Sequence, residues 1–115
     1  MKLLLAIVQP LKVDTVREAL KKIGVTRMTV CDAQGYGQQL GQSSMFREQE
    51  SHVRLLRKVA LEIVVNDDFV DRAIETIELA ARTGPEGQIG DGKVFVLPVE
   101  ETIRLGLTAE GPEAV

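Results

Sequence analysis

The sequence predicts an α+β domain whose strands and helices follow one another in the order βαββαβ. Three observations predict this fold class. Four short apolar runs have the length of strands, two segments carry apolar residues at helical spacing, and glycine, proline or aspartate separates the segments. The chain has 115 residues, of which 44% are hydrophobic and 27% charged, and this is the size and composition of one folded domain.

The first half predicts a strand, a helix and a second strand. Residues 3–8 form a continuous apolar run that Pro10 ends, as in a central strand buried on both faces. Apolar residues recur every three or four positions in 12–23, and Gly24 is a natural stop for that helix. Residues 28–33 have the composition of a second strand.

A long polar stretch separates this half from the next. Residues 35–52 show little hydrophobic periodicity, and loops of that length in a compact domain are usually functional. Residues 59–65 predict a third strand, and residues 66–68 can cap a helix with its apolar face within 69–81. Residues 94–97 predict the fourth strand.

The order of these elements is that of the ferredoxin-like plait, an antiparallel sheet with two helices on one face. The first and third strands are apolar on both sides, so the second sheet face also needs a cover. In so short a chain we expect another copy to supply it, which predicts a homo-oligomer. Residues 101–115 are expected to add a turn or edge strand around 103–105 and to be frayed from Ala109 onward.

Composition argues against several other classes of protein. The net charge of −3 and the small number of aromatic residues disfavour a nucleic-acid surface. The single Cys31 and single His52 allow neither an internal disulfide nor a structural zinc site within one chain. No run approaches the roughly 20 apolar residues of a membrane span, so we expect a cytoplasmic protein.

Two glycine-rich segments are the candidate ligand-binding turns. In 90–93, Gly-Asp-Gly-Lys precedes the fourth strand; its glycines leave backbone N–H groups open, and its lysine suits a phosphate. An ordinary turn is the alternative interpretation. The second segment, 35–39, is Gly-Tyr-Gly-Gln-Gln. Glu62 interrupts the third strand, either at an exposed position or as an acceptor for an amine such as that of adenine.

Several segments in order resemble one family. They read LLLAIVQP, DTVREALKKIGV, MTVCDAQGYGQQ, KVALEIVVNDDFVDRAIETIELAARTG and IGDGKVFVLPVEETIR, and they are similar to the PII nitrogen-regulatory signalling proteins from Met1 to about Arg104. The resemblance implies a non-catalytic homotrimer that binds ATP or ADP in clefts between subunits. It also implies a T-loop (37–55) that docks onto an ammonium transporter, enzyme or regulator, a B-loop (83–93) and a C-terminal segment (101–115).

The same resemblance implies which residues bind ligands. The adenine would lie near Ile7, Thr29, Glu62 and Val64, and the phosphates near the glycine-rich turns and Arg104. 2-Oxoglutarate would bind beside Mg²⁺ through Gln39 and Lys58, with Gln39 near the metal. The full set of implied nucleotide contacts is Ile7, Thr29, Gly35, Gly37, Gln38, Gln39, Glu62, Val64, Thr83, Gly90, Asp91, Gly92, Lys93 and Arg104.

The chain departs from the family pattern at the predicted phosphate site. Gln38 stands where a basic residue is usual, and Gly106 replaces a second arginine, so two cationic contacts are missing. Each such contact is worth on the order of 1–3 kcal/mol, which implies weaker triphosphate binding or a preference for ADP or AMP. Arg82 and Lys12 are the candidates for compensation. The inserted residues 85–87 either form an inert surface turn or reshape the phosphate site.

The T-loop departs as well. Ser51 replaces the tyrosine that relatives modify, which excludes uridylylation there and leaves serine phosphorylation as the alternative to an ordinary loop serine.

Two other functions compete with the PII interpretation. One is a divergent PII-like sensor of another metabolite, such as bicarbonate, that binds AMP or ADP. The other is a small enzyme on the same plait, such as an acylphosphatase, which needs a water-orienting asparagine. Asn66 is the only asparagine, and it lies at a strand end, which disfavours the enzyme.

Overall fold

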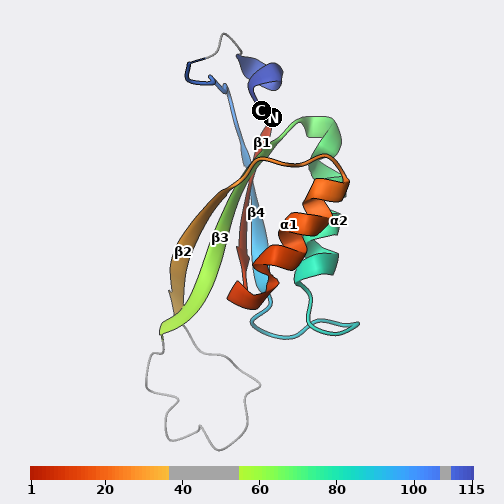
Figure 1. Ribbon diagram of the computed structural model, residues 1–115. Coiled ribbons are helices and arrows are strands. Elements are labelled where there is room, and N and C mark those ends of the chain that lie inside the picture. The colour runs from red at the N-terminus through yellow and green to blue at the C-terminus, as the bar shows by residue number, and fades with distance from the viewer. Residues whose placement is uncertain (37–54, 107–109) are drawn as a thin grey trace, which may run out of the picture.

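Figure 1 shows the computed structural model, which describes residues 1–36, 55–106 and 110–115. Four strands form one antiparallel sheet in the order β2-β3-β1-β4, and both helices lie on the same face of it. The order βαββαβ and the ferredoxin-like fold class are therefore confirmed. The bounds are β1 Lys2–Val8, η1 Pro10–Lys12, α1 Val13–Lys22, β2 Thr29–Tyr36, β3 Leu55–Val65, η3 Asp67–Phe69, α2 Val70–Ala81, β4 Gly92–Pro98 and η4 Gly111–Ala114.

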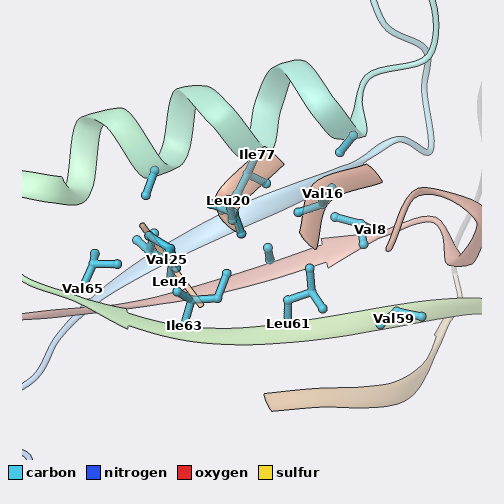
Figure 2. Close-up of a cluster of buried hydrophobic side chains, with 13 residues drawn as sticks. Leu4, Val8, Val16, Leu20, Val25, Val59, Leu61, Ile63, Val65 and Ile77 are labelled. Carbon is cyan, nitrogen blue, oxygen red and sulfur yellow. The ribbon is translucent and has the colours of Figure 1, made fainter. Parts of the chain in front are cut away.

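The core lies between the helices and the two central strands, as Figure 2 shows. Alternate residues of β1 and β3 point toward the helices because successive side chains of a strand face opposite ways. The helices contribute residues at spacings of three and four. The main buried set is Leu4, Ala6, Val8, Val16, Leu20, Val59, Leu61, Ile63, Val65, Ala73, Ile77 and Ala81.

The second face of the sheet is open in the single chain. The residues of β1 on this face, Leu3, Leu5 and Ile7, are only half-buried. Phe95 and Leu97 of β4 lie beside Leu5 and Leu3 and are 46% and 42% exposed. The central strands β1 and β3 are thus buried only on the helix side, and the predicted cover for the other side remains a prediction.

Three strands are longer than their apolar runs predict. β2 continues to Tyr36 and β3 begins at Leu55, because the backbone ladder continues through the pair Tyr36–Leu55 beyond the core. β4 begins at Gly92, so Gly92 and Lys93 lie in the strand rather than in the turn before it. Backbone pairing needs no apolar side chain, and hydrophobic pattern alone therefore misplaces these ends.

Two expectations about local structure are wrong. The side chain of Asn66 makes no capping bond to the following turn; its Nδ2 instead donates to the carbonyl of Pro112 at 3.3 Å. The tail is not frayed over residues 110–115: Ile103 pairs with Glu110, and Ala114 is 8% exposed. The tail folds back because it finds polar partners on the rest of the domain, which the sequence pattern did not indicate. Among the described residues, no helix is long and apolar enough to cross a membrane.

Candidate functional site

The segment from Arg82 to Asp91, between α2 and β4, lies at the end of the sheet where β2 ends and β3 begins (Figure 1). Arg82 anchors its start. Nη2 of Arg82 donates to Oε1 of Glu78 at 2.6 Å, and Nη1 donates to the carbonyl of Pro85 at 3.2 Å. The start of segment 85–87, expected to be an insertion, is therefore hydrogen-bonded to Arg82.

Asp91 holds the rest of this loop through three hydrogen bonds. Its carboxylate accepts bonds from the N–H of Thr83 at 2.9 Å, the hydroxyl of Thr83 at 2.6 Å and the N–H of Gln88 at 2.7 Å. These bonds stabilise the charged form and hold the pKa of Asp91 below its ordinary value, with the Thr83 hydroxyl as the largest cause. The predicted contacts Thr83 and Asp91 thus bind each other, and Asp91 serves as the internal acceptor of the loop.

Gly92 brings the start of β4 close against β1. Its φ is +124°, and a Cβ there would lie 1.8 Å from the carbonyl oxygen of Ile7. Only glycine fits this approach. The next residue, Lys93, pairs with Ile7 across the ladder, so these two predicted contacts are neighbours. The ammonium of Lys93 lies 5.5 Å from the centre of the Phe95 ring, on the open face of the sheet.

The carbonyl of Gly90 is the point where three segments meet. Nζ of Lys58 donates to it at 2.7 Å, and Nε2 of Gln9 donates to it as well. A Cβ on Gly35 would lie 3.5 Å from Cγ of Lys58. The structure therefore brings together Gly35, Lys58 and Gly90, which the sequence places far apart. The role of Gln9 was missed, because nothing local to that residue indicates a partner 81 positions away.

Of the remaining predicted contacts, Thr29 and Glu62 lie level with the middle of β1, whereas Val64 lies toward its start. Thr29 pairs with Glu62 across β2 and β3, and both are exposed on the open face. Val64 follows Glu62 on the same face, and Arg104 lies beside Val64 in a cleft of about 400 Å³. This Arg104 cleft is lined by Gly24, Val25, Thr26, Arg27, Val64, Val65, Asn66, Phe69, Arg104 and Val115.

A second cleft belongs to the loop end of the sheet. It has a volume of about 660 Å³ and lies between the end of α2, the loop and the start of β4. This B-loop cleft is lined by Ile7, Val8, Ile74, Ile77, Glu78, Ala81, Arg82, Glu86, Gly87, Gln88, Ile89, Asp91, Gly92, Lys93 and Val94. Lys93 and Arg104 therefore line different clefts of one chain.

The pairing of the strands gives the distance between Lys93 and Val64 along the sheet. Lys93 stands opposite Ile7, whereas Val64 stands opposite Leu3, four positions earlier on β1. At 3.2–3.4 Å per residue, the two levels are about 13 Å apart along the sheet. Thr29 and Glu62 lie between these two levels, because Glu62 stands opposite Leu5. The predicted contacts thus extend along the open face from Lys93 to Val64.

Four predicted site residues cannot be placed. Gly37, Gln38, Gln39 and Ser51 lie outside the described residues. Within the part of the chain that is described, no group of three or more His, Cys, Asp or Glu side chains lies close enough to hold a metal ion.

The two residues suggested as replacements for the missing cations have other partners. Arg82 is paired with Glu78, and Nζ of Lys12 donates to the carbonyl of Arg82 at 3.2 Å. Sequence reasoning did not consider Arg27, which lines the cleft of Arg104. The one available signal was a basic residue immediately before the second strand.

The chain is similar to known proteins along nearly its whole length. The family model "Nitrogen regulatory protein P-II" matches residues 1–108. This chain belongs to the P-II family. P-II proteins are regulators of nitrogen metabolism and act in signal transduction, as the resemblance in the sequence implied.

Individual P-II proteins are similar along their entire length. The nitrogen regulatory protein P-II of Azospirillum brasilense is 45% identical over 115 residues, which cover 100% of both chains. The P-II 1 protein of Escherichia coli is also 45% identical, with 100% of both chains covered. The crystal structure of Arabidopsis thaliana PII bound to citrate superposes with a TM-score of 0.78 at 39% identity, covering 99% of this chain and 91% of the other.

Proposed function

We propose that this P-II protein is a non-catalytic sensor that binds ATP or ADP between the subunits of a homotrimer and regulates partner proteins through residues 37–55. The observation that carries the proposal is that Lys93 lines one cleft and Val64 and Arg104 line another, with Lys93 and Val64 about 13 Å apart along the sheet. Two chains placed side by side would bring the Lys93 cleft of one chain and the Arg104 cleft of the other to the same nucleotide.

The loop end of the sheet has the chemistry of a phosphate site. Gly90 and Gly92 leave the backbone accessible, and the exposed Lys93 supplies a positive charge. The bonds of Asp91 already fix the loop, so little conformational entropy remains to be lost when a phosphate binds.

The middle of the open face has the chemistry of an adenine site. Thr29 and Glu62 stand side by side on an exposed surface that continues to Val64. A carboxylate and a hydroxyl can accept hydrogen bonds from the exocyclic amine of adenine, while apolar side chains contact its ring. This arrangement gives Glu62 a role that explains a charge on a central strand.

The same geometry supports a link between the ligand and the T-loop. Gly35, just before the T-loop, and Leu55, its last residue, lie at the end of the sheet where Lys58 contacts Gly90. A carboxylate ligand such as 2-oxoglutarate, bound with Mg²⁺ through Lys58 and Gln39, would act next to both ends of the T-loop. It would change the conformation of that loop through its different affinities for the loop states. The citrate in the Arabidopsis relative is a carboxylate of comparable size.

Titration calorimetry with AMP, ADP and Mg-ATP, each with and without 2-oxoglutarate, tests the proposal. We expect adenylate binding in the wild type, and an affinity loss of about tenfold or more in Lys93→Ala, because the charge on the phosphates loses its partner. Lys21→Ala, on the exposed end of α1, is the matched control and should bind like the wild type.

The outcomes separate the candidate functions. Binding that 2-oxoglutarate strengthens supports a nitrogen and carbon sensor. Adenylate binding that is indifferent to 2-oxoglutarate supports the divergent sensor of another metabolite, such as bicarbonate, which the losses at Gln38 and Gly106 favour. Absence of any adenylate binding would refute the nucleotide site.

A further inference from the structure

Among the described residues that line the Arg104 cleft, only two arginines have charged side chains. Arg27 enters it from the turn before β2, and Arg104 from the segment after β4. Arg27 is exposed and Arg104 is half-buried. Val115 also lines the cleft, but none of the ion pairs found among the described residues joins its terminal carboxylate, or any other acidic group, to either arginine.

Two guanidinium groups in one cleft repel each other unless an anion lies between them. Each offers a planar fork of N–H donors that matches the oxygens of a phosphate. The cleft of about 400 Å³ is large enough for part of a nucleotide. Its other side chains are uncharged, so the two guanidinium groups outnumber the one terminal carboxylate of Val115 and favour an anionic ligand.

We propose that Arg27 acts with Arg104 as a second guanidinium contact for the phosphate chain of the bound nucleotide. The inference rests on the nucleotide-binding function proposed above and adds a residue that determines specificity. It would replace one of the two cations missing at Gln38 and Gly106. Arg82 and Lys12, the other candidates, are engaged within their own end of the domain.

The backbone conformation of Gly106 disfavours an arginine at that position. Its φ is +79°, a conformation that an arginine would adopt only with strain. An arginine at 106 would therefore require a different path for this segment. Arg27, two residues before β2, lines the Arg104 cleft in the chain path that the structure has.

The test compares Arg27→Gln, Arg27→Lys and Arg17→Gln by titration calorimetry with AMP, ADP and Mg-ATP at two salt concentrations. Arg17 is the matched control, because it is paired with Asp14 at 3.1 Å on α1, away from the cleft. For Arg27→Gln we expect about fivefold to tenfold weaker binding of ADP and Mg-ATP, and a loss below about twofold for AMP. Arg27→Lys should fall between the wild type and Arg27→Gln.

Two further readouts separate a phosphate contact from a structural role. The affinity of Arg27→Gln for Mg-ATP should depend less steeply on salt than that of the wild type, because one charge pair is gone. The melting temperature of the ligand-free protein should not change, since Arg27 is exposed.

Each outcome decides between the two proposals. If Arg27→Gln binds all three nucleotides as Arg17→Gln does, the role of Arg27 is refuted and the nucleotide-binding function stands. An equal loss for AMP, ADP and Mg-ATP would also refute it, because a phosphate contact must discriminate by phosphate number. If the wild type binds no adenylate, both proposals fail together.

Discussion

At the scale of single residues, Gly92 is the described glycine at which the fold tolerates a side chain least. A Cβ there would lie 1.8 Å from the carbonyl oxygen of Ile7, and the φ of +124° adds backbone strain. We expect Gly92→Ala to lower the free energy of unfolding by about 2–4 kcal/mol, because the start of β4 must move away from β1. Urea denaturation followed by circular dichroism measures this change.

Gly84→Ala is the matched control for that prediction. Gly84 also has a positive φ, +71°, but no atom lies within 4 Å of the position that a Cβ would take there. The control should therefore show only the backbone cost of about 1–2 kcal/mol. Equal losses in the two variants would contradict the steric argument for Gly92.

The residue scale also shows where sequence reasoning succeeds and where it stops. Glycine spacing and Lys93 could be recognised locally, because a turn and its charge are close in the chain. The bonds of Gln9 and Lys58 to the carbonyl of Gly90 join residues 81 and 32 positions apart. Likewise, Arg27 became a candidate contact only because it lines the same cleft as Arg104. A single sequence does not show that these two residues are close in space.

At the scale of elements, the loop between α2 and β4 depends on the charge of Asp91. The loop is stabilised while this carboxylate is ionised, and the folded-state pKa lies below the ordinary value of 3.8. This stability is present above pH 3.8 and is lost as the pH falls through the lower, folded-state pKa. We expect Asp91→Asn to lower stability at pH 7 by about 1 kcal/mol, since solvent screens the bonds. Unfolding free energies from pH 2 to pH 7 measure it.

Asp32→Asn, on the exposed side of β2, is the control for this loop. It should leave the unfolding free energy unchanged across the same pH range. The difference between the wild type and Asp91→Asn should shrink as the pH falls below 4. A difference that is constant down to pH 2 would show that the charge of Asp91 is not what holds the loop.

Elements were predictable where burial dictates their pattern. The apolar runs of β1 and β3 and the helical spacing of α1 and α2 follow from the need to cover one core. Strand ends, the uncapped start at Asn66 and the folded tail follow from backbone and polar partners instead. Those partners come from distant segments, so local pattern could not indicate them.

At the scale of the whole molecule, the open sheet face and the proposed nucleotide site both predict association with another copy. The apolar residues on the open face are in contact with water in the single chain, and another copy would cover them. In the proposed trimer, the Arg104 cleft of one chain and the B-loop cleft of its neighbour would contact the same nucleotide. Association and ligand binding should therefore be lost together.

Leu97→Asp tests this coupling directly. Leu97 is 42% exposed on the open face, where a charge would oppose packing of the sheets but not folding of the chain. Light scattering after size exclusion should give three times the 12.6 kDa chain mass for the wild type and a single chain for the variant. Leu79→Asp, at a position 62% exposed on α2, should remain a trimer.

The monomeric variant should bind Mg-ATP at least about a hundredfold more weakly, because each chain retains only half of the contacts. A Leu97→Asp protein that stays trimeric would show that the open face is not the interface. A monomer that binds Mg-ATP at full strength would place the whole site within one chain.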